Sequence, residues 1–270
     1  MNFKKWDDYI VKPGIRIRLD KIPSDVPHDS ADKEKARKAL KEYRRQIDEL
    51  LRVLSIENKR SLLVVLQGMD ASGKDGAVRR VFTGINPQHC DIVSFKEPAG
   101  EELAHDYLWR VYRSLPAKGA CGVFNRSQYE DVLVPLARGS LSPQQARTRL
   151  RQIVDLERIW SENGISICKL FLHISPEEQT SRFQSRLDEP EKHWKVKESD
   201  FADRKRWKAF QAAYGEILAL TSAKDAPWYI IPADRKWYRD VAVAGIVLSK
   251  LRAMRPRLPK PRLDRSRYPL

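Results

Sequence analysis

The 270-residue sequence has few cysteines and no long apolar run. Its three cysteines, Cys90, Cys121 and Cys168, are far apart without a Cys-x-x-Cys spacing, and each lies in or beside an apolar stretch. Such cysteines support neither a disulfide framework nor a zinc site, so we expect buried free thiols. No apolar run approaches the ~20 residues that cross a bilayer, and the N-terminus has no apolar stretch of the signal-peptide kind. We therefore expect a cytoplasmic protein without a membrane partner.

The sequence also lacks internal repeats and any break in composition that would separate two domains. We expect one domain over residues 1–254, whose first part, residues 1–31, is an irregular arm because prolines and a glycine interrupt it. Residues 255–270 contain four prolines, and we expect little regular structure in this basic tail. The cations of the tail are Arg255, Arg257, Lys260, Arg262, Arg265 and Arg267.

The charge of the chain is strongly positive. There are 51 Lys and Arg against 36 Asp and Glu, which gives a formal net charge of +15. A field of this sign concentrates polyanions, which include nucleic acids, acidic membrane surfaces, nucleotides and inorganic phosphate polymers. Hydrophobic residues make up 41% of the chain, which is enough for a core and excludes disorder throughout.

Short apolar runs alternate along the chain with segments of helical periodicity. The apolar runs cover residues 61–66, 90–95, 120–124, 165–174 and 228–231. Apolar residues recur at three- and four-residue steps, as in amphipathic helices, over residues 32–57, 143–162, 200–221 and 237–254. Strands that alternate with helices predict an α/β fold with a five-stranded parallel sheet flanked by helices.

The clearest motif follows the first apolar run. Residues 68–74 read Gly-Met-Asp-Ala-Ser-Gly-Lys, which is G-x-x-x-x-G-K between a predicted strand and a predicted helix. In this setting, backbone N–H groups and the helix N-terminus surround phosphate oxygens, and Lys74 adds a mobile positive charge. A glycine-rich turn that only joins strand to helix is the alternative. The phosphate contacts that we predict here are Gly68, Ala71, Ser72, Gly73, Lys74, Asp75 and Gly76.

Two carboxylates distinguish this loop. Asp75 occupies the position of the usual Ser or Thr that contacts Mg²⁺, so the metal needs another ligand. Asp70 lies inside the loop, where it would repel phosphate unless a divalent cation lies between them. We therefore predict that Asp70 binds the metal. The alternative is that Asp70 caps the following helix or binds the loop backbone.

A second polar cluster, residues 124–131, follows the third apolar run. Ligands of open parallel sheets bind beyond the carboxyl ends of the strands, so we expect this cluster to face the phosphate loop. Arg126 can clamp a phosphate, and Glu130 or Asp131 can hold Mg²⁺ or position the acceptor. Either carboxylate can instead be an acid that interacts with the dipole at a helix start.

Residues 182–206 form a densely charged segment. In many phosphotransferases a charged flap closes over the reacting phosphates and excludes water, so we expect a lid here. Arg182 and Arg186 lie one helical turn apart on one face and are its best candidates for phosphate contact. The acidic residues of the segment also allow a simpler interpretation, a solvated face.

Together these motifs resemble the polyphosphate kinase 2 family. The resemblance lies in residues 62–76, 105–110, 125–132, 190–195 and 226–238. It implies a thymidylate-kinase-like P-loop fold with a lid, and exchange of the terminal phosphoryl of polyphosphate with a nucleotide. Asp70 and Lys74 match the family residues associated with metal and phosphate, and Arg126 matches the arginine of its second motif. The lid arginines correspond to Arg182 and Arg186.

Asn125 and Glu130 depart from many family members, which have aspartate at the first position and another residue at the second. The departure resembles the subgroup that phosphorylates both nucleoside mono- and diphosphates, with Glu130 taking part of the role of the missing carboxylate. The resemblance thus implies a reversible polyphosphate:AMP/ADP phosphotransferase, with Mg²⁺ or Mn²⁺ as cofactor. We further expect guanine nucleotides as acceptors and a homo-oligomer of two or four copies.

Two other functions compete with this one. An ATP-dependent nucleotide kinase would use the same loop, but it needs no field of +15. A nucleic-acid-binding protein would use the basic segments but leaves the phosphate loop without a role, so we expect no nucleic acid as physiological ligand.

The residues predicted for each role are as follows. The predicted catalytic residues are Asp70, Lys74, Arg126, Glu130, Arg182 and Arg186. The predicted nucleotide-binding residues are Asn125, Arg126, Tyr129 and Glu130. The predicted metal ligands are Asp70, Glu130 and Asp131. Further predicted phosphate contacts are Arg80, Lys192 and Lys195.

Overall fold

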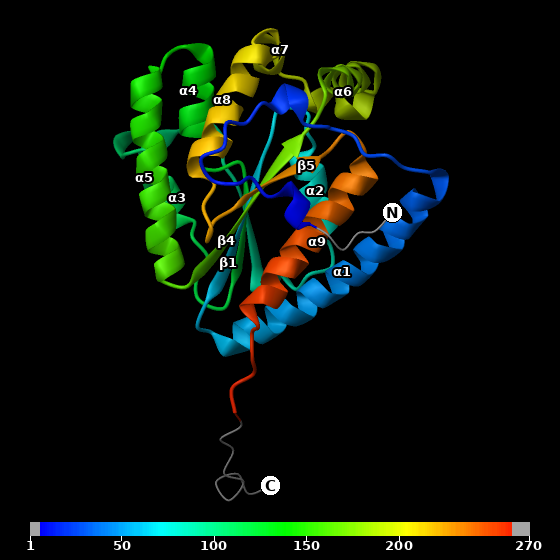
Figure 1. The fold of residues 1–270 in the computed structure, drawn as a ribbon, viewed down its shortest axis with the longest axis vertical. Helices are drawn as coiled ribbons and strands as arrows, with labels where there is room; N and C mark the ends of the chain where they lie inside the picture. Colours follow the sequence, from blue (N-terminus) through cyan, green and yellow to red (C-terminus); the bar gives the residue numbers. More distant parts are fainter. Residues whose placement is uncertain (1–5, 261–270) are drawn as a thin grey trace, which may run out of the picture.

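The computed structural model describes residues 6–260, apart from the side chains of residues 30 and 31, and has a central sheet between two helical layers (Figure 1). All neighbouring strands pair in parallel, in the order β2-β3-β1-β4-β5. The predicted five-stranded parallel sheet is therefore confirmed. The strands are β1 (Ser61–Gln67), β2 (Cys90–Ser94), β3 (Cys121–Asn125), β4 (Ile165–His173) and β5 (Trp228–Pro232).

The middle of the sheet is covered on both faces. Every residue of β1 and β3 is buried, as continuous apolar strands of parallel sheets usually are. Leu66, near the end of β1, pairs with Asn125 at the end of β3 on one side and with Leu170 of β4 on the other. The loops that follow β1 and β3 therefore leave the sheet side by side, at the edge where ligands bind in such folds.

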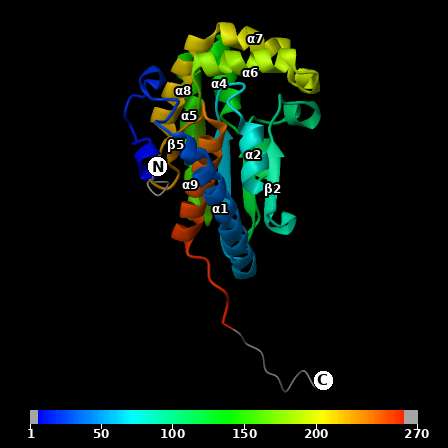
Figure 2. The ribbon, with the colours of Figure 1, turned by 90° about the vertical axis from the view of Figure 1, so that its right-hand side faces the viewer.

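Helices cover both faces of the sheet (Figure 1). One layer contains α1 (Ser30–Glu57), α2 (Lys74–Phe82) and α9 (Lys236–Met254), and the other contains α4 (Glu130–Arg138), α5 (Pro143–Glu162) and α8 (Trp207–Thr221). Over the carboxyl ends of the strands lie α6 (Pro176–Asp188), the 3-10 turn η5 (Pro190–Lys195) and α7 (Glu198–Lys205) (Figure 2). Shorter elements in the connections are α3 (Trp109–Arg113) and the 3-10 turns η1 (Asp7–Tyr9), η2 (Leu19–Lys21), η3 (Pro87–His89) and η4 (Gly100–Ala104).

One predicted helix is divided. Residues 200–221 were expected to be continuous, but the chain turns at Arg206, which joins α7 to α8. The two parts have different surroundings: α8 buries an apolar face in the core, whereas none of the α7 residues is buried. The turn is held by contacts with α4, because Arg206 donates to Arg138 O at 2.8 Å and Arg138 pairs with Asp203. The division directs α7 across the carboxyl ends of the strands.

The described part of the N-terminal arm, residues 6–29, has only the 3-10 turns η1 and η2 and packs on the outer edge of β5. Val11 N donates to Trp228 O at 2.8 Å, and Ile10 forms an antiparallel bridge with Tyr229. Trp6 lies so close to Gly245 of α9 that a Cβ there would overlap the indole ring. The arm therefore closes one edge of the sheet and contributes to the core.

The structure also bears on the basic tail, on membrane-spanning helices and on the cysteines. Residues 255–260 form no helix or strand, whereas residues 1–5 of the arm and Arg262, Arg265 and Arg267 of the tail lie outside the described residues. No helix in residues 6–260 is long and apolar enough to cross a membrane. The cysteines are free thiols, two of them buried and Cys90 half-buried.

Candidate active site

The phosphate loop connects β1 to α2 and has an unusual backbone. Gly68, Ala71 and Gly73 have φ values of 154°, 61° and 92°. A Cβ on Gly68 would lie 2.7 Å from Leu172 O, so only glycine fits there. Ala71 adopts a left-handed conformation that costs free energy for an L residue, and such strain concentrates in functional loops. The strand-to-helix setting of the motif is confirmed.

Lys74 is the first residue of α2 and reaches back over the loop. Its Nζ donates to Gly68 O at 2.7 Å and to Met69 O at 3.2 Å. Burial lowers the pKa of Lys74, and the charge of Arg126 lowers it further, while nearby carboxylates oppose the shift. Both acceptors are neutral carbonyls, so phosphate oxygens would be stronger partners for this ammonium group.

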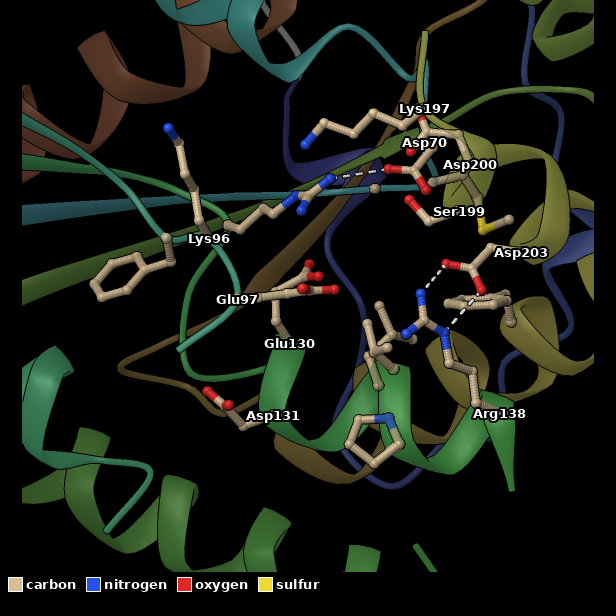
Figure 3. A pocket seen from close by; sticks show the side chains of 18 of the residues that line it. Asp70, Lys96, Glu97, Glu130, Asp131, Arg138, Lys197, Ser199, Asp200 and Asp203 are labelled. Atoms are coloured by element: carbon tan, nitrogen blue, oxygen red, sulfur yellow. Dashed lines mark hydrogen bonds and ion pairs between the residues drawn. The ribbon is translucent and has the colours of Figure 1, made fainter. Parts of the chain in front are cut away.

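A cavity of about 550 Å³ opens beside the loop (Figure 3). Asp70 from the phosphate loop and Arg126 from the loop after β3 both line it, and Arg126 Nη2 donates to Asp70 Oδ1 at 2.9 Å. Arg126 has a φ of 64°, which is again the left-handed region. The ion pair confirms that the two motifs face each other across the carboxyl ends of β1 and β3.

The adjacent acids Glu130 and Asp131 begin α4 but have different partners. Burial raises the pKa of Glu130, although Arg126 opposes the shift. With its amide oriented to satisfy both ends, Gln67 donates to Glu130 Oε1 at 2.8 Å. Asp131 accepts from Arg110 Nη2 at 2.9 Å, and Figure 3 shows its carboxylate turned away from that of Glu130. Of the two, only Glu130 is directed toward the phosphate loop.

The prediction that Tyr129 binds nucleotide is wrong. Its side chain is fully buried in the core, where its hydroxyl donates to Glu157 Oε1 at 2.8 Å and accepts from Lys169 Nζ at 3.1 Å. Tyr129 precedes α4, and successive residues at a helix start point in different directions. Glu130 therefore faces the cavity while its neighbour faces the interior.

Asn125 connects the end of β3 to the unusual Asp75 of α2. Its Nδ2 donates to Asp75 Oδ1 at 2.6 Å. The uncharged amide of Asn125 therefore donates a hydrogen bond to the Asp75 carboxylate, which replaces the usual hydroxyl. An aspartate at this position would bring two carboxylates together, which is unfavourable unless a proton or a cation is shared between them.

The sequence profile described as polyphosphate kinase 2 matches residues 30–259. The chain belongs to this family. An AMP/ADP-polyphosphate phosphotransferase from Meiothermus ruber is 42% identical over 254 residues, which cover 94% of this chain and 95% of the relative. An ADP-polyphosphate phosphotransferase from Rhodopseudomonas palustris is 37% identical over 268 residues, which cover 95% and 93%.

The crystal structure of polyphosphate kinase 2 from Arthrobacter aurescens TC1 has the same fold. It is similar to this chain with a TM-score of 0.92 at 35% sequence identity, and the match covers 98% of this chain and 95% of that one. The family that the motifs resemble and the predicted P-loop kinase fold are both confirmed.

The predicted lid residue Arg182 is already packed against the phosphate loop. Its guanidinium donates to Ala71 O at 2.8 Å, to Ala233 O at 2.7 Å and to Asp234 O at 3.0 Å. Its Nε pairs with Glu178, and the side chain is 9% exposed. We expected Arg182 to be available for phosphate in a lid, but here its donors hold backbone carbonyls. Its position is therefore that of a clamp on the loop.

The other predicted lid cations have partners within residues 176–205. Arg186 pairs with Asp200 at 2.9 Å, and Lys192 pairs with Glu189. Lys195 lies over the ring of a neighbouring tryptophan. None of these three cations lines the cavity. The contacts join α6, η5 and α7 into one charged layer, here called the α6–α7 segment.

Arg239 and Lys236 of α9 were not predicted from the sequence. The Arg239 guanidinium lies so close to Gly73 that a Cβ there would overlap it. Burial lowers the pKa of Lys236, and Arg182, Lys192 and Arg239 lower it further. These cations therefore lie near one another. Residues 235–239 read Arg-Lys-Trp-Tyr-Arg, and this run of cations after the last strand was the available signal.

We call Arg80, Arg182, Lys192, Lys236 and Arg239 the cation cluster. Its members come from α2, α6, η5 and α9. Burial lowers the pKa of Arg239, and the charges of Arg182 and Arg80 lower it further, whereas Asp240 opposes the shift. None of the five lines the cavity. The phosphate loop thus has the cavity on one side and the cation cluster against its Ala71–Gly76 backbone.

The cavity contains several side chains that were not singled out in the sequence. Arg110 lies over the Phe95 ring, and Arg138 pairs with Asp203 at 2.8 Å, which joins α4 to α7 (Figure 3). Glu97 also lines it. These residues come from separate loops and helices, so no local pattern marks them. Apart from Tyr214, the apolar part of the lining is Met69, Phe95, Pro98, Leu133, Val134, Pro135 and Phe210.

The three predicted metal ligands do not form one cluster. In residues 6–260, no three His, Cys, Asp or Glu side chains lie close enough to hold a metal ion. Asp131 accepts from Arg110 through Oδ2 and is turned away from Glu130, so its role as a metal ligand stays a prediction. Within residues 6–260, the hydrogen bond that the Asp70 side chain accepts comes from Arg126 and uses Oδ1. Its Oδ2 is therefore left for a cation. Mg²⁺ commonly uses one or two carboxylates and takes its other ligands from water and substrate phosphates, so this site fits it.

Proposed function

We propose that this chain transfers the terminal phosphoryl group of inorganic polyphosphate to AMP and to ADP, reversibly and with Mg²⁺. The observation that carries the proposal is the position of the phosphate loop between a cavity of about 550 Å³ and the cation cluster. A cavity of this volume accommodates one nucleotide-sized ligand. The names of the relatives from M. ruber and R. palustris, which specify AMP/ADP and ADP, support the acceptors.

The cavity provides what a nucleotide acceptor needs. Its apolar lining can contact a base, and Arg126 can bind the phosphates beside the loop. Glu130 lies next to Arg126 on the same loop and helix start, where it can position the acceptor through bound metal or water. The Asn125 and Glu130 combination favours acceptance of both AMP and ADP.

The cation cluster provides what a polymeric donor needs. Five cations from four elements lie outside the cavity, around the backbone that precedes and begins α2. An ATP-dependent kinase handles a short anion that Mg²⁺ largely neutralises, and it has no use for cations beyond the terminal phosphates. A polyphosphate chain carries a charge on each phosphate, so the accessible cations Arg80, Lys192 and Lys236 can bind along its path. The buried Arg182 and Arg239 already bond to carbonyls and to Asp240, so they add to the positive field without contacting the polymer.

Phosphoryl transfer through a loose transition state depends on alignment and charge neutralisation rather than covalent catalysis. In this proposal, the loop N–H groups and Lys74 hold the terminal phosphoryl group, and Arg126 neutralises charge on the acceptor side. Asp70 holds Mg²⁺, which supplies further positive charge to the phosphates when bound. The α6–α7 segment covers the site and limits the access of water.

Several expectations remain predictions. They are guanine nucleotides as further acceptors, Mn²⁺ as a substitute for Mg²⁺, assembly into two or four copies, and a cytoplasmic location. Polyphosphate and purine nucleotides are the proposed partners.

The test is a chromatographic assay of the purified protein with polyphosphate, Mg²⁺ and either AMP or ADP, without ATP. We expect ADP from AMP, followed by ATP, and ATP from ADP. Robust transfer from ATP to AMP without any transfer from polyphosphate would make the chain an ordinary nucleotide kinase. Binding of single-stranded DNA in preference to polyphosphate would favour the nucleic-acid function.

Two variants connect this activity to the phosphate loop. Lys74→Ala and Asp70→Asn should each lose at least ~10²-fold in turnover, the scale seen when one preorganised charge-stabilising group is removed. Lys118→Ala is the matched control, because Lys118 is exposed in the loop before β3, at the opposite end of the sheet. Asp70→Asn should keep a melting temperature near the wild-type value, whereas Lys74→Ala should lower it by only a few degrees because it removes two carbonyl contacts. A collapse in either variant would indicate a structural role.

A further inference from the structure

A buried polar cluster lies directly behind the loop that carries Arg126 and Glu130. Its core is the ion pair between Glu157 of α5 and Lys169 of β4, whose Nζ and Oε2 are 2.6 Å apart. The two side chains are 3% and 0% exposed. Neither residue lines the cavity, so they cannot contact a substrate there.

Lys169 uses its three N–H groups on three different elements. Besides Glu157, its Nζ donates to Tyr129 Oη at 3.1 Å and to Thr221 O at 2.7 Å. The ammonium also lies over the rings of Tyr129 and Trp228, at 5.5 and 5.2 Å from their centroids. The donors of Lys169 are thus fully used, and its position is fixed by α5, α8 and the start of α4.

Glu157 in turn holds the loop. Its Oε1 accepts from Tyr129 Oη at 2.8 Å and from Gln128 Nε2 at 3.1 Å. Both donors are fully buried and lie in the loop between Arg126 and Glu130. Apart from Lys169, the hydrogen-bond partners of Glu157 side-chain oxygens within residues 6–260 all belong to this loop.

We propose that the Glu157–Lys169 pair positions the loop so that Arg126 and Glu130 reach the acceptor. Arg126 has a left-handed φ of 64°, and a strained backbone persists only where its surroundings determine it. The hydrogen bonds from Gln128 and Tyr129 to Glu157 hold this backbone in place from the core side. Glu157 and Lys169 are therefore positioning residues, and this role rests on the function proposed above.

Stability alone does not explain the pair. The loss of solvation on burying two charges can exceed their attraction, so a buried ion pair is weak evidence for a stabilising role, and apolar residues of similar volume often serve a core as well. An ion pair does offer directional hydrogen bonds to a chosen segment. Here those bonds are directed at the two residues between Arg126 and Glu130.

The test compares two Tyr→Phe variants that each remove one buried hydroxyl, one inside this cluster and one outside it. Tyr129→Phe breaks the contacts from the loop to Glu157 and Lys169 without changing the ring. Tyr238→Phe is the matched control: it makes the same change in α9, where the buried hydroxyl bonds Tyr9 Oη and none of the residues of this cluster. Steady-state kinetics with AMP and polyphosphate, and melting temperatures, are measured for both.

We expect Tyr129→Phe to raise the KM for AMP about 5- to 10-fold, the effect of losing about one net hydrogen bond at the acceptor side. The KM for polyphosphate should change by less than about twofold, because the cation cluster is held by other elements. Tyr238→Phe should leave both KM values near those of the wild type. A purely structural role would reduce the active fraction alone and move neither KM.

Equal kinetic effects of the two variants, or an effect of Tyr129→Phe on melting temperature alone, would overturn the positioning role. Failure of the wild-type protein to use polyphosphate would instead overturn the proposed function. In that case the calorimetric Kd for AMP tests the same role: a several-fold weakening in Tyr129→Phe only supports it, and an unchanged Kd refutes it.

Discussion

Replacing Arg182 with alanine tests whether this residue clamps the phosphate loop or waits for phosphate in a lid. The side chain is 9% exposed and connects three parts of the chain. It donates to Ala71 O in the phosphate loop, to Ala233 O and Asp234 O after β5, and to Glu178 within its own helix. Arg186, one turn later, is the matched comparison, because its contacts stay within the α6–α7 segment.

The size of the effect follows from the carbonyls that lose their donor. Three carbonyl contacts at a net value of about 1 kcal/mol each predict a loss of about 3 kcal/mol in the free energy of unfolding. For a protein of this size that corresponds to a fall of about 6 °C or more in melting temperature. The Arg186 side chain is more exposed and pairs with Asp200, so Arg186→Ala should cost about 1 kcal/mol or less, or about 2 °C.

Thermal unfolding followed by circular dichroism, together with turnover and nucleotide affinity, separates the two roles. A clamp predicts that Arg182→Ala lowers both melting temperature and turnover, while Arg186→Ala changes the melting temperature little. A melting temperature of Arg182→Ala within about 2 °C of wild type, combined with a large loss of turnover alone, would refute the clamp and restore the mobile lid residue. Arg182→Lys should have a melting temperature between those of the wild type and Arg182→Ala, because one ammonium group can satisfy only some of the three carbonyls.

Three further predictions concern charge. The apparent affinity for polyphosphate should fall steeply with added NaCl and rise with chain length, whereas that for AMP should respond far less; equal salt slopes in KM measurements would contradict the cation cluster as the polymer site. Burial holds the pKa of His173 below its usual 6.5, so the free energy of unfolding should decrease as the pH falls below 6.5 toward that lowered pKa. His173→Gln can still donate to Ile22 O and should lose part of this slope in urea unfolding, and an unchanged slope would assign it to other groups. Asn125→Asp should place a carboxylate against Asp75 and lower the melting temperature at neutral pH, with recovery on adding Mg²⁺ and no such recovery for Asn125→Ser as control.

The sequence predicts the parts of the site that depend on local pattern. The phosphate loop could be found because a buried strand, two glycines at fixed spacing and a helix start occur in one continuous segment. The meeting of Asp70 with Arg126 could also be expected, since parallel strands bring the loops after them to one edge. Both inferences need only strand order and direction.

Other roles depend on contacts between distant parts of the chain. Tyr129 is next to Glu130 in sequence, but Glu157 and Lys169 lie in other elements and determine that it faces the core. Similarly, the charge pattern of α6 cannot show that Arg182 meets Ala71, because this contact depends on how α6 packs over the sheet. Sequence pattern therefore identifies charged residues near a site more readily than it identifies which of them are free to bind.

The arm before α1 has a practical consequence for defining the smallest unit that folds. The family profile begins at residue 30, yet the backbone of β5 is covered by Ile10 and Val11, and Trp6 fills the space above Gly245. A protein shortened to the matched region would keep every strand and the phosphate loop but expose the unpaired edge of β5. Such an edge invites pairing between copies, and hence aggregation. The segment that the family profile matches thus leaves out the residues that cover the edge of β5.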